Sequence, residues 1–268
     1  MYLEVIFLTW DFQLTYKEII IMKNGEWKSI LPRQKLPILI ICRDLVSDLK
    51  LLVNWFEKTG HENIILLDNN SSYPPLLEYL STSPHEVIRL NSNFGHRSPW
   101  FSKFVERFDK STPFVVTDPD LLPDPEAPED SFEYFQELLL RYKDFDKVGF
   151  GLHIDDIPVI NPYRDQIIQW EKPFWNKELE PLVYAAHLDT TLALHRPQTP
   201  YKVTEAIRTG WPYMAKHLPW YRDPFNTNEE TAYYLMNRDN QVGYWNRQSL
   251  HPEVAKRFPD FDSTNKLF

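Results

Sequence analysis

A D-x-D triplet, Asp118-Pro119-Asp120, follows directly after the apolar run Phe114–Thr117. Residues i and i+2 of an extended segment point to the same side of the chain, so the two carboxylates can converge on one cation. Hard cations such as Mg²⁺ and Mn²⁺ take one or two carboxylates and complete their coordination with substrate phosphates. The triplet therefore predicts a metal–diphosphate site, and the alternative is an acidic turn whose geometry Pro119 sets. Two other such triplets, which begin at Asp144 and Asp260, do not follow a strand of this kind.

The elements that must hold these carboxylates alternate between strand and helix. Four short apolar runs predict strands, at residues 37–42, 63–67, 86–90 and 113–117, and the first, second and fourth are typical of strands buried on both faces of a sheet. Helices are predicted between them: one over residues 45–56 that ends at Gly60, one opened by Pro74, and one at residues 100–108. Because strands joined through helices pair in parallel, the pattern predicts an α/β fold with a mainly parallel central sheet flanked by helices.

Polar side chains gather where the predicted strands end. In an open α/β sheet, ligands bind in the crevice at the carboxyl ends of the strands. The residues at those ends are Asp68, Asn69, His96, Arg97, Asp118 and Asp120. These side chains therefore lie where the topology predicts a ligand site.

The second half of the chain is less regular. The elements expected there are a connector at 123–130, a helix at 132–142, strands at 147–152 and 185–194, and a partly helical segment at 205–217. At the two ends, residues 1–35 contain β-like apolar runs and predict an extension, and residues 246–268 predict a polar tail.

Composition excludes several classes of protein. The seven glycines have no spacing that makes GxxxxGK[ST] or GxGxxG, so a P-loop or Rossmann phosphate cradle is excluded. Gly95, Gly149 and Gly151 remain as places where the backbone could approach a ligand closely. A net charge of -9 argues against a nucleic-acid partner, which would need clustered Lys and Arg. The single cysteine, Cys42, allows no intramolecular disulfide and suits a reducing compartment.

Hydropathy gives an expectation about location. No apolar stretch approaches the roughly 18 residues that span a bilayer, and the first residues lack the basic segment of a signal peptide. We therefore expect a cytoplasmic protein with no transmembrane segment, and peripheral attachment to a membrane stays open.

Four segments at the ends of predicted strands resemble, in their order, those of the GT-A fold glycosyltransferases, particularly the bacterial family-2-like enzymes. The segments are Arg43-Asp44, 67–71, 93–97 and 117–120, within a resemblance that spans residues 37–234. It implies a GT-A-type nucleotide-sugar-binding fold, with a donor half at 36–125 and an acceptor and catalytic half at 126–245. Pro119 is a departure, because the middle residue of the family's D-x-D motif is more commonly small or polar.

The resemblance implies a nucleotide-diphosphate sugar, a UDP-sugar, as donor and Mn²⁺ or Mg²⁺ as cofactor. Asp68 matches the position that contacts the base or ribose, Asp118 and Asp120 match the metal–diphosphate motif, and residues 93–97 match an Asn-x-Gly segment that faces the nucleotide. The donor-binding candidates are Arg43, Asp68, Asn69, Asn93, His96, Arg97 and Asp118. Alternatively, Asp68 is a turn residue and residues 96–97 belong to a solvated loop.

The resemblance also implies a catalytic base, often followed by a late histidine that binds the metal. Asp189 precedes His217 in an order similar to that of the family, and His217 begins an HLPWY segment like that of family-2-like proteins. A neutral imidazole can complete the coordination of Mn²⁺, although a histidine bonded within an aromatic core is an alternative. Glu229 and Glu230 form a second candidate for the base, and their alternative is an acidic helix start.

The resemblance therefore implies a glycosyltransferase, and an inverting one, that moves a sugar from the donor to a hydroxyl group of a glycan or other acceptor. The metal would neutralise charge on the leaving diphosphate while a carboxylate accepts the acceptor's proton. The tryptophans that could present flat faces to sugar rings are Trp170, Trp175, Trp211 and Trp220. Alternatives are a nucleotidyltransferase, which usually has a glycine-rich N-terminal loop that is missing after residue 42, a glycoside hydrolase, and a non-catalytic carbohydrate-binding protein.

Overall fold

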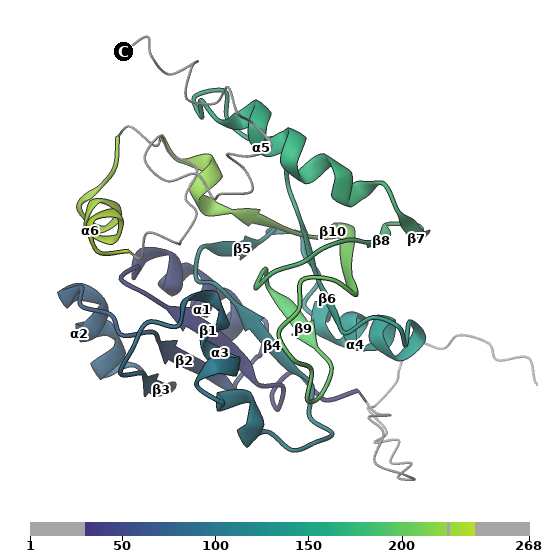
Figure 1. The fold of residues 1–268 in the computed structure, drawn as a ribbon, viewed down its shortest axis with the longest axis horizontal. Coiled ribbons are helices and arrows are strands. Elements are labelled where there is room, and N and C mark those ends of the chain that lie inside the picture. The colour runs from purple at the N-terminus through teal and green to yellow at the C-terminus, as the bar shows by residue number, and fades with distance from the viewer. Residues whose placement is uncertain (1–29, 224–225, 239–268) are drawn as a thin grey trace, which may run out of the picture.

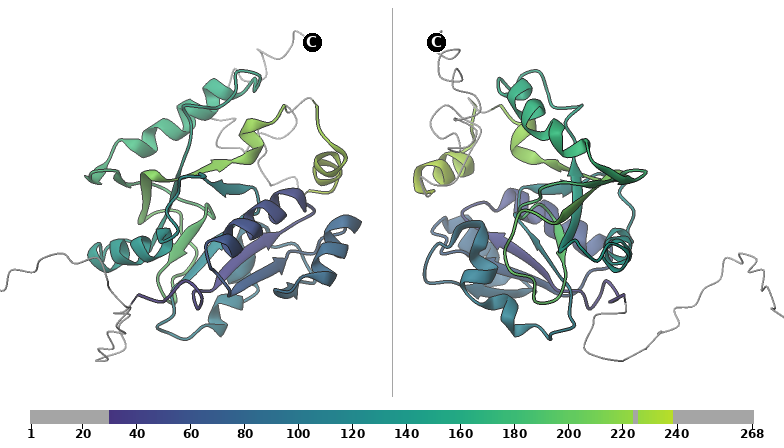
Figure 2. Two further views of the ribbon diagram at one scale, coloured as in Figure 1. Left: turned by 180° about the vertical axis from the view of Figure 1, so that it is seen from behind. Right: turned by 45° about the vertical axis from the view of Figure 1, so that its right-hand side comes forward.

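The computed structural model describes residues 30–223 and 226–238 (Figure 1). Most of the predicted N-terminal extension, and all of the polar tail, lie outside these residues. A central sheet has helices on both of its faces, so the predicted α/β class is confirmed (Figure 2). Within the described ranges, no helix is both long and apolar enough to cross a bilayer.

One sheet runs through the described part of the chain. Its strand order is β3-β2-β1-β4-β9-β6-β10-β8-β7, and β5 pairs with β10 away from this path. The strands are β1 (Ile38–Cys42), β2 (Ile64–Asp68), β3 (Glu86–Arg89), β4 (Phe114–Thr117), β5 (Leu121–Pro123), β6 (Lys147–Leu152), β7 (Glu178–Glu180), β8 (Val183–Ala185), β9 (Ala193–His195) and β10 (Ala206–His217).

Strand direction explains how the polar loops come together. β1 pairs in parallel with β2 and β4, and β2 pairs in parallel with β3. β6 and β10 are also parallel to each other. Because β9 is antiparallel to both β4 and β6, these two parallel groups point the same way. The loops that follow β1, β2 and β4 therefore leave the sheet at one edge, as the sequence predicts.

Helices cover both faces of the sheet. They are α1 (Ser47–Lys58), α2 (Pro74–Thr82), α3 (Ser98–Phe101), α4 (Ser131–Arg141), α5 (Arg164–Glu171) and α6 (Glu229–Asn237), with one-turn 3₁₀ helices at Gly95–Arg97, Phe104–Arg107, Lys172–Trp175 and Leu218–Tyr221. Along β1, Ile38 and Ile40 join the core with α1, α2 and α4, whereas Leu39 and Ile41 join a second core with Phe104. This alternation is what a strand buried on both faces requires.

The helix predicted at residues 100–108 is only partly correct. The structure has α3 followed by the 3₁₀ helix Phe104–Arg107, with Lys103 between them in the left-handed conformation (φ 59°). That backbone conformation interrupts a right-handed helix.

Two predictions for the second half of the chain were wrong. Residues 205–217, expected to be partly helical, form the 12-residue strand β10. β10 pairs with β6 on one edge and with β8 and β5 on the other, so partners distant in sequence override local preference. Residues 185–194, expected to be one strand, contain the end of β8 and the start of β9, separated by a loop.

Candidate functional site

The D-x-D carboxylates lie at the carboxyl end of β4, where Asp118 is bonded to the loop before β9. The Asp118 N–H donates to the carbonyl of Thr190 at 3.2 Å. In return, the Thr190 hydroxyl donates to Asp118 Oδ2 at 2.5 Å. Burial and the charge of Asp120 raise the pKa of Asp118 well above its usual value, although the Thr190 hydrogen bond opposes the rise. A negative charge on Asp120 disfavours a second negative charge on Asp118, since like charges repel.

Asp120 faces His217, the last residue of β10. His217 Nε2 lies 3.4 Å from Asp120 Oδ2, and the edge of the Trp220 ring packs on the imidazole with the ring centroids 4.8 Å apart. Burial would raise the pKa of Asp120, but the charges of His217 and Arg222 and a hydrogen bond from His217 outweigh it and hold the pKa below its usual value. The structure therefore places His217 beside Asp120, two residues from Asp118, and a metal shared by the three stays a prediction.

These groups fit a divalent cation only in part. Within residues 30–223 and 226–238, no three His, Cys, Asp or Glu side chains form a ready-made metal site. Asp118 and Asp120 provide two carboxylates whose mutual repulsion a cation would relieve. Because His217 Nε2 is directed at Asp120, its role as a third ligand stays a prediction. A cation held here would take its remaining ligands from a bound phosphate.

Asp189 lies in the same loop as Thr190 and is held by two distant residues. The Tyr201 hydroxyl donates to Asp189 Oδ1 at 2.6 Å. The ammonium group of Lys147, a residue only 1% exposed, donates to the main-chain carbonyl of Asp189 at 3.0 Å. Burial lowers the pKa of Lys147 to about 8. The Asp189 side chain itself is exposed, so its carboxylate is accessible to a substrate.

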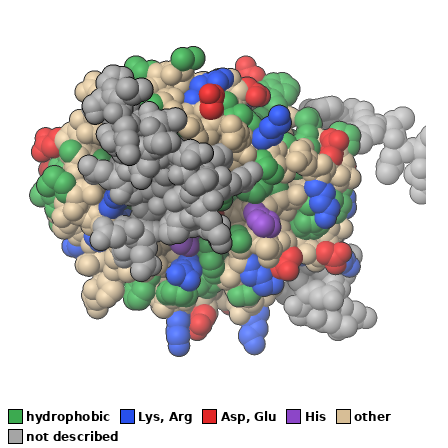
Figure 3. Space-filling model, turned by 45° about the horizontal axis from the view of Figure 1, so that its top comes forward, with side chains coloured by type: hydrophobic (Ala, Val, Ile, Leu, Met, Phe, Trp, Pro, Cys, Tyr) green, Lys and Arg blue, Asp and Glu red, His purple; other side chains and the backbone are tan. Residues whose placement is uncertain are grey.

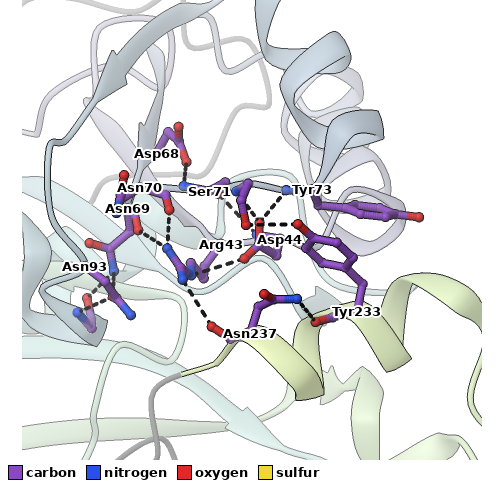
Figure 4. Close-up of polar contacts among 12 residues, drawn as sticks. Arg43, Asp44, Asp68, Asn69, Asn70, Ser71, Tyr73, Asn93, Tyr233 and Asn237 are labelled. Carbon is purple, nitrogen blue, oxygen red and sulfur yellow. Dashed lines mark hydrogen bonds and ion pairs between the residues drawn. The ribbon is translucent and has the colours of Figure 1, made fainter.

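The loops after β1 and β2 are bonded to each other (Figure 4). The Arg43 guanidinium donates to the carbonyl oxygens of Asn69, at 3.0 Å, and of Asn70. Asp44 is fully buried, and its Oδ1 accepts the N–H groups of Ser72 and Tyr73 at 2.6 and 2.8 Å. Asp44 therefore fixes the two residues that lead into α2, which begins at Pro74.

Asp68, the predicted base or ribose contact, is fully buried and bonded within the protein. Its Oδ1 accepts the Ser71 N–H at 2.9 Å, and its Oδ2 accepts Arg89 Nε at 2.8 Å. The arrangement matches the turn that the sequence left as the alternative. Direct contact with a nucleotide stays a prediction and would require Asp68 to exchange one of these partners.

Asn69 connects the loop after β2 to the predicted Asn-x-Gly segment. Its amide Nδ2 donates to Asn93 Oδ1 at 2.7 Å and to the Gly95 carbonyl at 3.1 Å, while its Oδ1 accepts the Phe94 N–H at 2.8 Å. Gly95 adopts φ +62°, a conformation that favours glycine, and nothing lies within 4 Å of where a Cβ would be. Of the three candidate glycines, this one keeps open space beside it.

His96 and Arg97 are the last two residues of this segment, 93–97, and they contact different partners. The His96 ring lies 5.3 Å from the Tyr201 ring, centroid to centroid. The Arg97 guanidinium lies over the Phe101 ring at 4.8 Å. Tyr201, which contacts the His96 ring, also donates a hydrogen bond to Asp189.

Glu230 of α6 caps another helix. Its Oε1 accepts the backbone N–H groups of Val46 and of Ser47, the latter at 2.8 Å, and its Oε2 accepts the Ser47 hydroxyl. These contacts place a buried carboxylate at the N-terminus of α1, where a negative charge is stabilising. Glu229 is exposed, and the start of α6 itself is capped by Asn228.

α6 also covers the loops after β1 and β2 (Figures 1 and 4). Arg43 donates to the carbonyl of Asn237 at 3.2 Å, at the end of α6. The Tyr233 hydroxyl contacts Ser72 Oγ at 3.1 Å, and the Tyr233 and Tyr73 rings lie 4.9 Å apart. α6 thus contacts these loops through its middle and its C-terminal end.

At Gly149 and Gly151 of β6, other parts of the protein fill the space beside the backbone. A Cβ on Gly149 would lie 2.9 Å from the Thr191 carbonyl oxygen, and one on Gly151 would lie 2.3 Å from that of Thr209 and 2.5 Å from the Trp175 ring. The expectation that these two glycines leave room for a ligand was therefore wrong, because neighbouring backbone fills that space.

The four tryptophans differ in exposure. Trp220 is 4% exposed and belongs to the core, whereas Trp211 is 55% exposed. Trp175 packs over Gly151, and Trp170 is half-buried. Trp211 therefore keeps the most ring surface available to a sugar.

One face of the molecule carries charged side chains of both signs. In Figure 3, basic, acidic and hydrophobic side chains are interspersed over the described part of the face in view.

Sequence reasoning missed Thr190, Tyr201 and Lys147. Thr190 could have been suspected because it follows Asp189 directly. Tyr201 and Lys147 reach Asp189 from outside its own loop, and no motif marks either of them.

Comparisons with known proteins are remote. No family model and no curated protein matches the chain. One similar solved structure is described as a mycobacterial protein, with 10% identity over 82% of this chain and 81% of that chain and a TM-score of 0.39. Another is glucosyl-3-phosphoglycerate synthase from Mycobacterium tuberculosis in complex with phosphoglyceric acid, with 11% identity over 60% of this chain and 57% of that chain and a TM-score of 0.36. What this chain does must therefore be inferred from its own residues.

Proposed function

We propose that this protein is a metal-dependent glycosyltransferase. It would move a sugar from a nucleotide-diphosphate donor, such as a UDP-sugar, to a hydroxyl group of a glycan or another acceptor, with inversion at the anomeric carbon. The observation that carries the proposal is the link from Asp118 through Thr190 to the adjacent Asp189. This link supports the proposal because it joins the loop of an exposed carboxylate, which could act as a base, to a carboxylate pair that could bind a cation.

The donor half supplies the first part of the chemistry. Asp118 and Asp120 would hold Mn²⁺ or Mg²⁺, which when bound offsets the charge that develops on a leaving diphosphate. Asn93, Gly95 and the backbone after β2 would face the nucleotide, because Asn69 fixes these segments against each other. Arg43 and Asp68 would act mainly by holding the loops, since their polar groups bond to the protein.

Asp189 supplies the second part. A new bond forms between the acceptor oxygen and the anomeric carbon, and the bond from that carbon to the diphosphate oxygen breaks. The proton of the acceptor hydroxyl passes to the Asp189 carboxylate. Glu230 is less suited to this role because both of its oxygens bind the start of α1.

A donor screen tests the proposal. The full chain is incubated with UDP-, GDP- and dTDP-sugars and Mn²⁺, with simple glycosides as acceptors, and release of the nucleoside diphosphate is measured. We expect one donor to be consumed by the wild type, with Asp189→Asn at least about 100-fold slower and Glu229→Gln unchanged. Pyrophosphate release from a nucleoside triphosphate and a sugar phosphate would instead indicate a nucleotidyltransferase. Equal rates for Asp189→Asn and wild type would show that the base is elsewhere.

A further inference from the structure

We infer that Tyr201 is a positioning residue that holds the Asp189 carboxylate for proton transfer. The inference rests on the proposed function, because it assigns Tyr201 a role in preparing the base of that reaction. The sequence gives no motif for this tyrosine, which lies in the loop between β9 and β10.

The hydrogen bond leaves Asp189 both held and free to react. The Tyr201 hydroxyl donates to Oδ1 at 2.6 Å. Within the described part of the chain, Oδ2 accepts no hydrogen bond. One oxygen therefore fixes the orientation of the carboxylate, and the other is available to an acceptor hydroxyl group. A catalytic base needs this arrangement, since its geometry must be set before its proton affinity matters.

The Tyr201 ring is itself fixed from several sides. Its centroid lies 5.3 Å from the centroids of both the His96 and the Trp100 rings. Trp100 Nε1 donates to the Thr199 carbonyl at 2.9 Å, which ties the loop that carries Tyr201 to α3. Lys147 Nζ lies 5.9 Å from the Tyr201 ring centroid while it donates to the Asp189 carbonyl. With its ring packed in this way, Tyr201 presents its hydroxyl in one direction.

The position of Tyr201 also relates the base to the donor side of the site. His96 belongs to the segment that Asn69 fixes through Asn93 and Gly95. Tyr201 contacts His96 with its ring and Asp189 with its hydroxyl. One side chain thus spans from the predicted nucleotide-binding segment to the predicted base, and it sets the separation between them.

Tyr201→Phe tests this role, because phenylalanine keeps the packed ring and removes only the hydroxyl donor. We expect kcat for sugar transfer to fall roughly 10- to 100-fold, the range that loss of alignment produces, while KM for the nucleotide sugar changes less than about twofold. In an Asp189→Ala background, Tyr201→Phe should have no further effect on the residual rate, since it acts through Asp189. 4-Aminophenylalanine at position 201, which restores an N–H donor on the same ring, should recover most of the lost kcat.

Tyr142→Phe is the matched control. The Tyr142 hydroxyl also donates to a carboxylate, Glu180 Oε2 at 2.8 Å, on β7. We expect this variant to transfer sugar at the wild-type rate. Urea unfolding of each variant shows whether a loss of activity is a loss of folding.

The outcomes separate this inference from the proposed function. A folded wild type that consumes none of the nucleotide sugars overturns the proposed function, and the role of Tyr201 falls with it. An active wild type with an equally active Tyr201→Phe overturns the role of Tyr201 alone. A fall in kcat of the same size in the Asp189→Ala background overturns it as well, because Tyr201 would then act without Asp189.

Discussion

The Thr190 hydroxyl donates to Asp118 Oδ2 at 2.5 Å, across 72 residues of sequence. The Asp118 N–H returns a bond to the Thr190 carbonyl at 3.2 Å, so two hydrogen bonds join the end of β4 to the loop before β9. Asp189 directly precedes Thr190 in this loop. The predicted metal ligand and the predicted base are therefore held by one pair of residues, and movement of either segment would disturb both.

Thr190→Val should weaken cation-dependent nucleotide binding. Valine has the shape of threonine but cannot donate a hydrogen bond to Asp118. Loss of a hydrogen bond that orients a metal ligand typically lowers metal affinity about 10- to 100-fold, and we expect a change in this range when Mn²⁺-dependent binding of UDP is measured by calorimetry. Thr191→Val is the matched control, because the Thr191 hydroxyl makes no hydrogen bond within the described part of the chain. Similar affinities for the two variants would contradict a role for the Thr190 hydroxyl.

Glu230→Gln should destabilise the protein without removing transfer. The substitution removes the negative charge from the start of α1 and weakens the bond from the Ser47 hydroxyl. We expect the free energy of unfolding, measured in urea, to fall by about 1–2 kcal/mol. Glu229→Gln, at an exposed neighbouring position, should change it by less than about 0.5 kcal/mol. Unchanged stability together with abolished transfer in Glu230→Gln would instead identify Glu230 as the base.

Because Lys147 is buried, the stability of the protein should change with pH in the alkaline range. Its pKa is lowered by burial from the ordinary 10.5 to about 8 in the folded protein. Between these values the unfolded chain holds a proton that the folded chain has lost, so stability rises with pH in this window. Relative to Lys147→Met, the wild type should gain up to about 3 kcal/mol in free energy of unfolding from pH 7.5 to 10.5. If the free energies of unfolding of the two proteins changed with pH in parallel, this would show that burial does not lower the pKa of Lys147.

The first four strands could be predicted because each is a short run rich in apolar residues; β1, β2 and β4 are buried at every position, whereas the edge strand β3 is partly exposed. Local sequence is enough there: Ile38–Cys42 and Ile64–Asp68 are buried at every position, and each is followed by polar turn residues. β10 could not be predicted in this way, because its strand conformation depends on pairing with β6, β8 and β5. Nor could the sequence predict that the space beside Gly149 and Gly151 of β6 is filled, because the carbonyl groups of Thr191 and Thr209 reach it from other segments.

For the site, motifs in the sequence identified candidate residues but not their hydrogen-bond partners. Asp118, Asp120, His217 and Asp189 come from motifs, and the structure brings them into one region. The spacing of residues in the sequence could not reveal that Arg89 and Ser71 donate hydrogen bonds to the Asp68 carboxylate. Nor could it reveal that Glu230 accepts a hydrogen bond from the start of α1. These contacts join segments far apart in the chain, so only the folded arrangement shows them.

In the proposed function, Asp118 and Asp120 bind a nucleoside diphosphate through a divalent cation. Isothermal titration of UDP, GDP and dTDP into the full chain, with and without Mn²⁺, measures this directly. We predict that one of them binds the wild type only when Mn²⁺ is present, and that Asp120→Asn lowers this affinity at least about tenfold, while Glu229→Gln binds normally. Binding that is equally strong without Mn²⁺, or no binding of any of the three to the folded wild type, would contradict this role of Asp118 and Asp120.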